Sequence, residues 1–179
     1  IIMKVLCSIS ARIGSKEIPK KNLREIGGKP LIAHSIETAK KSNLIDKIIV
    51  NTDSDEIAQV SRDFGAEVPF IRKKNLARDD VPLLMVTKNT MEEMIKQNYL
   101  PDIVIQLAPT CPFIKSDTID ETIRNAKRFD CSVSLKVVEH EHPYRAKLLN
   151  KDNIFKNFID TIDVEKFQSR QDLPKLYCT

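Results

Sequence analysis

Glycine is scarce in this chain, with 4 residues in 179, and tryptophan is absent. No GxxxxGKS/T or GxGxxG pattern can be written from these glycines, so neither of the common phosphate-binding loops occurs. With 3 tyrosines and no tryptophan, the chain has few aromatic platforms on which unpaired bases could stack. These absences disfavour nucleic acid as a partner, and they mean that a phosphate ligand must be held mainly by side chains.

Long apolar runs are missing as well. None reaches the ~18 residues that span a bilayer, and the N-terminal residues lack the layout of a secretory signal. The four cysteines form no CxxC pair, which favours reduced thiols. Cys7 and Cys131 lie in apolar runs and are predicted to be buried free thiols. We therefore expect a cytoplasmic protein with no membrane partner.

The apolar runs that are present alternate with helical patterns. Strand-like runs lie at 3–10, 46–53, 67–71, 101–108 and 131–139, and helical patterns at 31–43, 54–66, 83–98 and 115–130. Ser54 or Asp53 is expected to cap the second helix, which should stop near Gly65. Continuous apolar strands between helices predict a doubly wound α/β fold with a mostly parallel sheet. The alternation covers residues 1–139 and breaks down over 140–179, which is polar, aromatic and irregular.

The loop after the first strand run is the most basic segment at a strand end. Ligands of open parallel sheets bind beyond the carboxyl ends of the strands. Arg12, Lys16 and Lys21 lie in this loop and can offer cations to a polyphosphate, with backbone N–H groups around Gly14 and Ser15 as a second source of donors. The alternative is that these cations only solvate a surface loop, and charge alone does not decide between the two.

Other candidate residues carry weaker signals. His140 and His142 alternate along an extended segment and could share an ion, but no third ligand group lies at a usual spacing, so no metal site is predicted. His34 lies within a helical pattern and is interpreted as structural. Asp53 is interpreted as an acid at a helix start, with a functional carboxylate as the alternative. No GxSxG elbow is present for a serine hydrolase.

Several long motifs resemble one family. The stretch ISARIGSKEIPKKNLREIGGKPLIAHSI resembles the opening motif of the acylneuraminate cytidylyltransferases, the CMP-N-acetylneuraminate and CMP-nonulosonate synthetases. IIVNTDSDEIAQVSRDFGAEVPFIRKKNLARDD, PTCPF, HPYR and SRQDLP resemble later segments of that family in the same order. The resemblance therefore covers essentially the whole chain and implies a Rossmann-like nucleotidyltransferase fold.

The resemblance also implies a reaction. The anomeric hydroxyl of a nine-carbon 2-keto-3-deoxy sugar acid, of the sialic, legionaminic or pseudaminic type, would attack the α-phosphate of CTP and release pyrophosphate. Two alternatives remain. One is 3-deoxy-manno-octulosonate cytidylyltransferase, whose opening motif typically lacks the triplet at Lys20–Asn22. The other is a nucleotide-binding homologue without catalysis.

Site residues follow from the resemblance by position. Arg12 and Lys21 would be catalytic and hold the triphosphate, the backbone at Ser10 and Ala11 would read cytosine, and Arg72 with the 76–80 loop would close on the base or ribose. The full nucleotide-binding set is Ser10, Ala11, Arg12, Gly14, Ser15, Lys16, Lys21, Asn22, Arg72, Asp79 and Gln106. The sugar-binding set is Arg145, Arg170 and Gln171.

The chain departs from the family pattern at several positions. Ala108 stands where the family commonly has a glutamine that touches the nucleotide, and Gln106 lies two residues earlier on the same strand face. Cys111 replaces the serine of a Pro-Thr-Ser-Pro turn, and Leu83 stands where a polar residue is usual. All three changes concern recognition of the base and ribose, and they bear on the identity of the sugar as well.

The resemblance also sets expectations for the domain plan, the metal and the assembly. Residues 1–139 would form the nucleotide-binding α/β domain, and 140–179 would begin a dimerisation and sugar-binding segment of the same domain. We expect a homodimer, and Mg²⁺ bound with CTP by a late pair of aspartates that the family carries beyond the point matching Thr179. The prediction is therefore an incomplete enzyme without its metal ligands.

Overall fold

The computed structural model describes residues 3–15, 17–129, 131–137, 143–149, 151, 155–159 and 174–178. The chain divides into two compact units, Ile1–Ser132 and Val133–Thr179. The predicted division of roles at residue 139 stays a prediction, because it concerns function rather than compactness. None of the helices in the described residues is long and apolar enough to cross a membrane.

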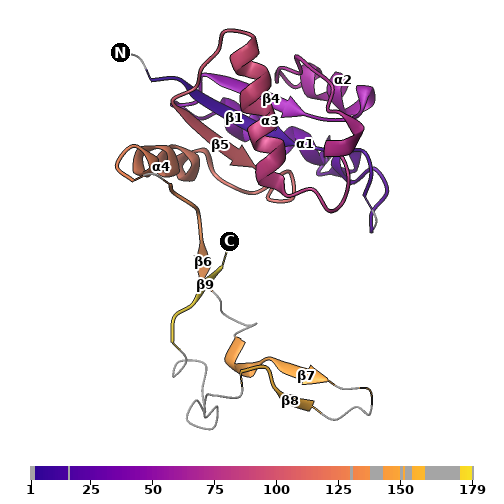
Figure 1. The fold of residues 1–179 in the computed structure, drawn as a ribbon, viewed down its shortest axis with the longest axis vertical. Coiled ribbons are helices and arrows are strands. Elements are labelled where there is room, and N and C mark those ends of the chain that lie inside the picture. Colours follow the sequence, from indigo (N-terminus) through magenta and orange to yellow (C-terminus); the bar gives the residue numbers. More distant parts are fainter. Residues whose placement is uncertain are drawn as a thin grey trace. The chain divides into compact units, whose positions relative to one another are not determined.

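A parallel sheet forms the centre of the first unit. Its strands are β1 (Val5–Ser10), β4 (Lys47–Asn51) and β5 (Ile103–Leu107), in the order β4-β1-β5 (Figure 1). Both neighbours run parallel to β1, with Leu6 opposite Lys47 on one side and Val104 on the other. The predicted strand at 67–71 is reduced to an isolated parallel bridge between Ile49 and Glu67.

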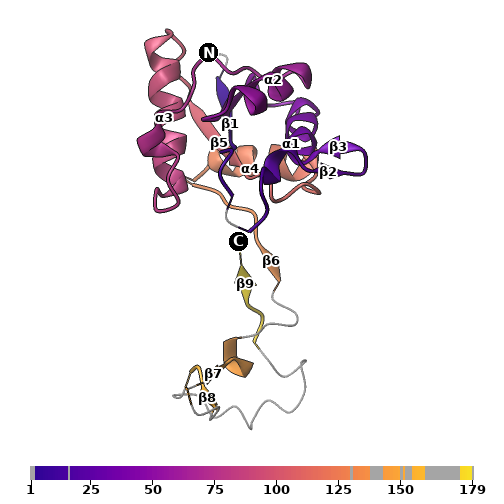
Figure 2. The same cartoon turned by 90° about the vertical axis from the view of Figure 1, so that its right-hand side faces the viewer.

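Helices cover both faces of this sheet. They are α1 (Leu31–Lys40), α2 (Asp55–Asp63), α3 (Leu83–Lys96) and α4 (Ser116–Ala126). The helix α3 packs against β1 and β4 on one face, whereas α1 and α4 lie together on the other, with α2 beside α1 (Figure 2). This arrangement confirms the predicted doubly wound α/β fold.

The core lies between these layers. The central strand β1 is buried from Val5 to Ile9, because helices cover it from both sides. Ile32 and Ile36 of α1, and Ile119 and Ile123 of α4, recur at i, i+4 and are at most 1% exposed. Burying a side chain of this size contributes about 1.5–3 kcal/mol. This packing places the carboxyl ends of the strands at one edge of the sheet.

Of the two cysteines predicted to be buried, one is buried and one is exposed. Cys7 is buried in β1, as predicted, and burial raises the pKa of its thiol to about 12. Cys131 is exposed, so the prediction that it is buried was wrong. Residues 131–135 form no strand and Val133 and Leu135 are more than half exposed, because no sheet neighbour within the described part of the chain covers this apolar run.

The start and stop of α2 follow the sequence signals. The side chain of Ser54 accepts a hydrogen bond from the Ile57 N–H at 3.4 Å, so Ser54 rather than Asp53 is the cap. Gly65 follows the helix with a φ of +93°, a conformation that glycine adopts without a steric penalty.

A short hairpin was not predicted. The strands β2 (Glu25–Ile26) and β3 (Lys29–Pro30) pair antiparallel around Gly27 and Gly28. Their φ values of +59° and +79° suit a two-residue turn in which both central residues are left-handed. Two of the scarce glycines therefore serve this turn and not a ligand.

The described residues of the second unit form short strands and a 3₁₀ turn. The strand β6 (Lys136–Val137) pairs antiparallel with β9 (Tyr177–Cys178), and β7 (Lys147–Leu149) pairs with β8 (Phe155–Asn157). The 3₁₀ turn η3 (Pro143–Arg145) precedes β7. Of the predicted strand at 131–139, residues 131–135 form no strand, 136–137 form β6, and 138–139 lie outside the described residues. The segment expected to be irregular contains the antiparallel pair β7–β8.

Candidate active site

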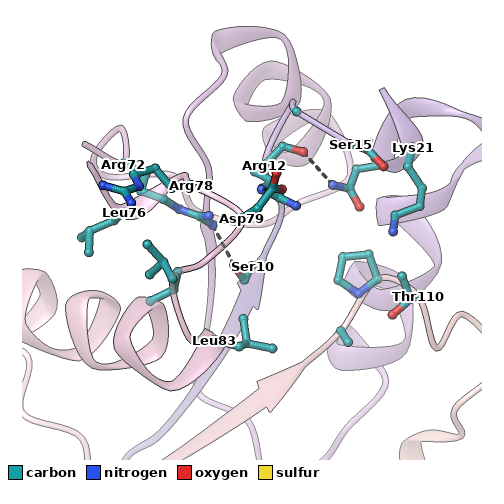
Figure 3. Close-up of a pocket in the computed structure, with 16 residues that line it drawn as sticks. Ser10, Arg12, Ser15, Lys21, Arg72, Leu76, Arg78, Asp79, Leu83 and Thr110 are labelled. Atoms are coloured by element: carbon teal, nitrogen blue, oxygen red, sulfur yellow. Dashed lines mark hydrogen bonds and ion pairs between the residues drawn. The ribbon is translucent and has the colours of Figure 1, made fainter. Parts of the chain in front are cut away.

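A cavity of about 240 Å³ lies where β1 and β5 end (Figure 3). Three stretches that are far apart in the sequence line it, within 10–22, 72–86 and 108–110. The lining residues are Ser10, Arg12, Gly14, Ser15, Lys21, Asn22, Arg72, Leu76, Arg78, Asp79, Val81, Leu83, Val86, Ala108, Pro109 and Thr110. In Figure 3, Lys21 and Thr110 lie at one end and Arg72 and Leu76 at the other, with Arg12 and Asp79 between them.

Most of the predicted nucleotide residues in the described part meet at this cavity. They are Ser10, Arg12, Gly14, Ser15, Lys21, Asn22, Arg72 and Asp79. Ala11 is fully buried and does not line it, and its N–H donates to the Asn51 carbonyl at 3.1 Å. The Gln106 side chain is also outside the lining and accepts a hydrogen bond from the Thr87 hydroxyl at 2.7 Å.

Some candidate residues are not placed at the cavity. Lys16, Arg170, Gln171, His140 and His142 lie outside the residues that the structure describes. Arg145 belongs to η3 in the second unit. The ring of His34 contacts the Ile26 carbonyl at 2.8 Å, which agrees with its structural interpretation.

Sequence reasoning did not single out several lining residues. Arg78 was named only as part of a loop, and Thr110 only as part of a turn motif. Val86 begins the buried side of α3, and nothing in an apolar helical position distinguishes a residue that also lines a cavity. The arginine in the motif 76–80 was the one signal that could have been used.

Hydrogen bonds hold the first loop in place. The Asn22 amide donates to the Arg12 carbonyl at 2.9 Å, and the Ile13 N–H donates to the Asp53 carboxylate at 2.9 Å. The 3₁₀ turn η1 (Lys21–Leu23) starts after Lys20, whose φ is +51°, and the Leu23 N–H closes the turn on the Lys20 carbonyl at 2.8 Å. This turn presents Lys21 and Asn22 to the cavity.

Arg72 is buried in a polar network at one end of the cavity (Figure 3). It is 4% exposed, and its Nε donates to Asn51 Oδ1 at 2.7 Å while its Nη2 donates to Ser10 Oγ at 2.7 Å. The Asn51 amide in turn donates to Thr90 at 3.0 Å, which links the network to α3. Burial lowers the pKa of Arg72 to about 10, against the opposing effect of the Asp53 charge, so the side chain is a cation at neutral pH.

An ion pair joins two sides of the cavity. Arg12 pairs with Asp79, and its Nη1 also donates to the Ala77 carbonyl at 3.4 Å. The side chains of Arg12 and Asp79 are 33% and 39% exposed. A pair this exposed contributes about 0–1 kcal/mol, so an anion that binds Arg12 can replace it at little cost.

The cavity is electropositive. Its lining contains the cations Arg12, Lys21, Arg72 and Arg78 and, within the described residues, a single carboxylate, that of Asp79. A concave surface lined mainly by one sign of charge attracts a ligand of the opposite sign. The geometry therefore suits a small polyanion.

The described residues contain no preformed cluster of metal ligands. No group of three or more His, Cys, Asp or Glu side chains gathers among them. Mg²⁺ is commonly held by one or two carboxylates together with the phosphates of a bound nucleotide, so a site of that kind needs no such cluster.

Comparisons with known proteins agree on one family. The chain is 37% identical over 177 residues to a pseudaminic acid cytidylyltransferase of Campylobacter jejuni, covering 98% of this chain and 75% of that protein. It is 40% identical over 121 residues to a CMP-N,N'-diacetyllegionaminic acid synthase of Legionella pneumophila, covering 68% of this chain and 52% of the relative.

A solved structure shares the fold. A CMP:2-keto-3-deoxy-manno-octonic acid synthetase complexed with CTP superposes with a TM-score of 0.64 at 22% identity, covering 97% of this chain and 70% of that one. A family model described as cytidylyltransferase matches residues 6–178, almost the whole sequence. The electropositive cavity at the strand ends thus lies in a nucleotidyltransferase fold, and the chain belongs to the cytidylyltransferase family.

Proposed function

We propose that this chain transfers CMP from CTP to a nine-carbon 2-keto-3-deoxy sugar acid and that pyrophosphate leaves. The observation that carries the proposal is the meeting of Arg12, Lys21 and Arg72 in one cavity at the end of β1. The names of the relatives support the sugar class, since they act on pseudaminic and N,N'-diacetyllegionaminic acids.

The cavity residues fit the chemistry of this transfer. The oxygen of the sugar's anomeric hydroxyl forms a bond to the α-phosphorus of CTP and loses its proton to solvent, and the bond between the α-phosphorus and the bridging oxygen to the β-phosphate breaks. Negative charge then builds up on the leaving pyrophosphate. Arg12 offers a planar fork of donors and Lys21 a compact cation, so both stabilise that charge when they contact the β- and γ-phosphates.

The other end of the cavity suits the nucleoside. Arg72 is fixed by Asn51 and Ser10, and its fixed position allows it to set where the base or ribose lies. Leu83, Val86 and Ala108 line the cavity with apolar surface, on which the faces of the base and ribose can pack. Within the proposal, Asp79 gives up Arg12 to the triphosphate when the nucleotide binds.

The remaining parts of the proposal rest on family membership. Arg145, Arg170 and Gln171 would contact the sugar acid, the enzyme would act as a homodimer in the cytoplasm, and Mg²⁺ would accompany CTP. The alternative acceptor is the eight-carbon 3-deoxy-manno-octulosonate, which the shared fold at 22% identity does not favour over the nine-carbon acids.

Nucleotide binding tests the proposal first. Calorimetric titration with CTP, UTP, ATP and GTP, each with magnesium, should show selective binding of CTP. Pyrophosphate release should then be measured with pseudaminic, legionaminic, sialic and 3-deoxy-manno-octulosonic acids. Release only with the eight-carbon acid would replace the proposed acceptor, and CTP binding without turnover on any acid would favour the non-catalytic alternative. No nucleotide binding at all would overturn the proposal.

A further inference from the structure

One peptide unit in the first loop is held at both ends by side chains. The carbonyl of Arg12 accepts from the Asn22 amide, and the N–H of the same peptide unit, on Ile13, donates to Asp53, each at 2.9 Å. One residue earlier, the Ala11 N–H donates to the Asn51 carbonyl at 3.1 Å. The backbone of residues 11–13 is therefore attached to two other segments, one that contains Asn22 and one that contains Asn51 and Asp53.

Ile13 is partly buried and packs against the core, whereas the next residue, Gly14, has no such contact. A Cβ built on Gly14 would meet no atom within 4 Å, so the backbone there lies in open space. The orientation of the Arg12 side chain depends on the backbone that carries it, and a rotation of the 12–13 peptide plane would turn the guanidinium away from its present position. The hydrogen bonds to Asn22 and Asp53 oppose that rotation.

Asp53 has no other assigned role at this place. It does not line the cavity, so it is not positioned to contact the nucleotide. It does not cap α2 either, because Ser54 does. Its carboxylate reaches back 40 residues along the sequence to the Ile13 N–H. Its charge also favours the protonated form of Arg72, which offers a second explanation that an experiment must separate.

We propose that Asp53 is a positioning residue, whose carboxylate oxygen fixes the Arg12–Ile13 peptide and thereby aims the Arg12 guanidinium at the triphosphate. The inference rests on the proposed function. In glycine-rich phosphate loops the backbone itself contacts the phosphates. In this glycine-poor loop the backbone is held by hydrogen bonds to Asn22 and Asp53, and the Arg12 side chain contacts the phosphates. What Asp53 must supply is an acceptor at that point, not a negative charge.

Two substitutions separate the acceptor from the charge. Asp53→Asn keeps an oxygen that can accept from the Ile13 N–H and removes the charge, whereas Asp53→Ala removes both. Asp55→Asn and Asp55→Ala are matched controls at an exposed aspartate two residues away. Asp53→Ala should weaken CTP binding about tenfold, the factor that one hydrogen bond supplies, and Asp53→Asn should stay within about threefold of wild type. The Asp55 variants should bind CTP as wild type does.

Amide hydrogen exchange gives a readout that is independent of ligand. The Ile13 N–H should exchange slowly in wild type and in Asp53→Asn, and fast in Asp53→Ala. In turnover assays the loss in Asp53→Ala should fall on both KM for CTP and kcat, since Arg12 acts in binding and in the transition state. If Asp53→Ala does not fold, fast exchange of the Ile13 N–H in wild type, or a tenfold loss of CTP affinity in Asp53→Asn, would still overturn the inference.

Different failures have different meanings. A wild-type chain that binds no CTP overturns the proposed function, and this inference with it. Wild-type CTP binding that is unchanged in Asp53→Ala overturns the inference alone. An Asp53→Asn variant whose CTP affinity falls as far as that of Asp53→Ala would show that the charge, acting on Arg72, is what matters.

Discussion

The two long loops that meet at the cavity are held by different kinds of contact. The loop that carries Arg12 is tied through its backbone to Asn22, Asn51 and Asp53. The loop that carries Asp79 reaches across through an ion pair with Arg12 that is more than a third exposed on the Asp79 side. Backbone hydrogen bonds fix an orientation, whereas an exposed ion pair exchanges readily for another anion. Within the proposed function, the loop that carries Arg12 is the fixed side that binds phosphate, and the loop that carries Asp79 is the side that can move away from Arg12 when the ligand binds.

The largest expected effect comes from removing Arg12, which belongs to the first loop and pairs with Asp79 of the second. Arg12→Ala should lower kcat/KM for CTP by about 10³-fold, because the bidentate donor to the leaving pyrophosphate is lost. Steady-state assays of pyrophosphate release would measure it. Arg128→Ala is the control, since Arg128 is exposed beyond the end of α4. Turnover unchanged in Arg12→Ala would show that this loop is only a basic surface.

The second largest effect is expected on stability, from the buried network in which Asn51 holds Arg72. Asn51 is fully buried and accepts from Arg72 while donating to Thr90. Asn51→Ala should lower the free energy of unfolding by about 3 kcal/mol, because it leaves the buried Arg72 cation short of an acceptor. Denaturant unfolding would measure the change, with the exposed Asn75→Ala as control. A loss below about 1 kcal/mol would mean that water replaces the asparagine and that the network is not essential.

The smallest effect is expected at Asp79, whose loop is joined to Arg12 by the exposed ion pair. Asp79→Asn removes the charge that pairs with Arg12, and CTP affinity should change by less than about fivefold, the range of an exposed ion pair. Calorimetry with CTP would measure it, and Asp80→Asn in the same loop gives a comparison. A loss above tenfold would contradict the exchange of partners and would indicate that Asp79 itself contacts the bound nucleotide.

Local patterns in the sequence predicted where the helices and strands lie better than they predicted which elements pack against one another. The strand at β1, the cap at Ser54 or Asp53 and the stop near Gly65 depend on residues within a few positions of one another, so they could be predicted, and the structure shows that Ser54 is the cap. Cys131 shows the limit, because an apolar run is buried only where a neighbouring element covers it. The hairpin at Gly27–Gly28 was missed because its glycines were tested only as a phosphate loop.

The candidate site divides in the same way. Position after the first strand identified Arg12 and Lys21, and the family resemblance added Asn22, Arg72 and Asp79, all of which line the cavity. Gln106 was expected to face the nucleotide because it shares a strand face with position 108. In the structure Ala108 lines the cavity, whereas the Gln106 side chain is bonded to Thr87, and its role stays a prediction.

The sequence by itself determined the alternation of buried strands and helices, and with it the edge of the sheet where a ligand is expected. It also determined that the loop at this edge is rich in cations and poor in glycine. Only the tertiary structure decided that Asp53 reaches the Ile13 N–H, that Arg72 bonds to Ser10, and that Asp79 meets Arg12. The reason is physical: periodicity records which face of an element is buried, but contacts between residues 40 to 67 positions apart depend on how the packed elements bring their loops together.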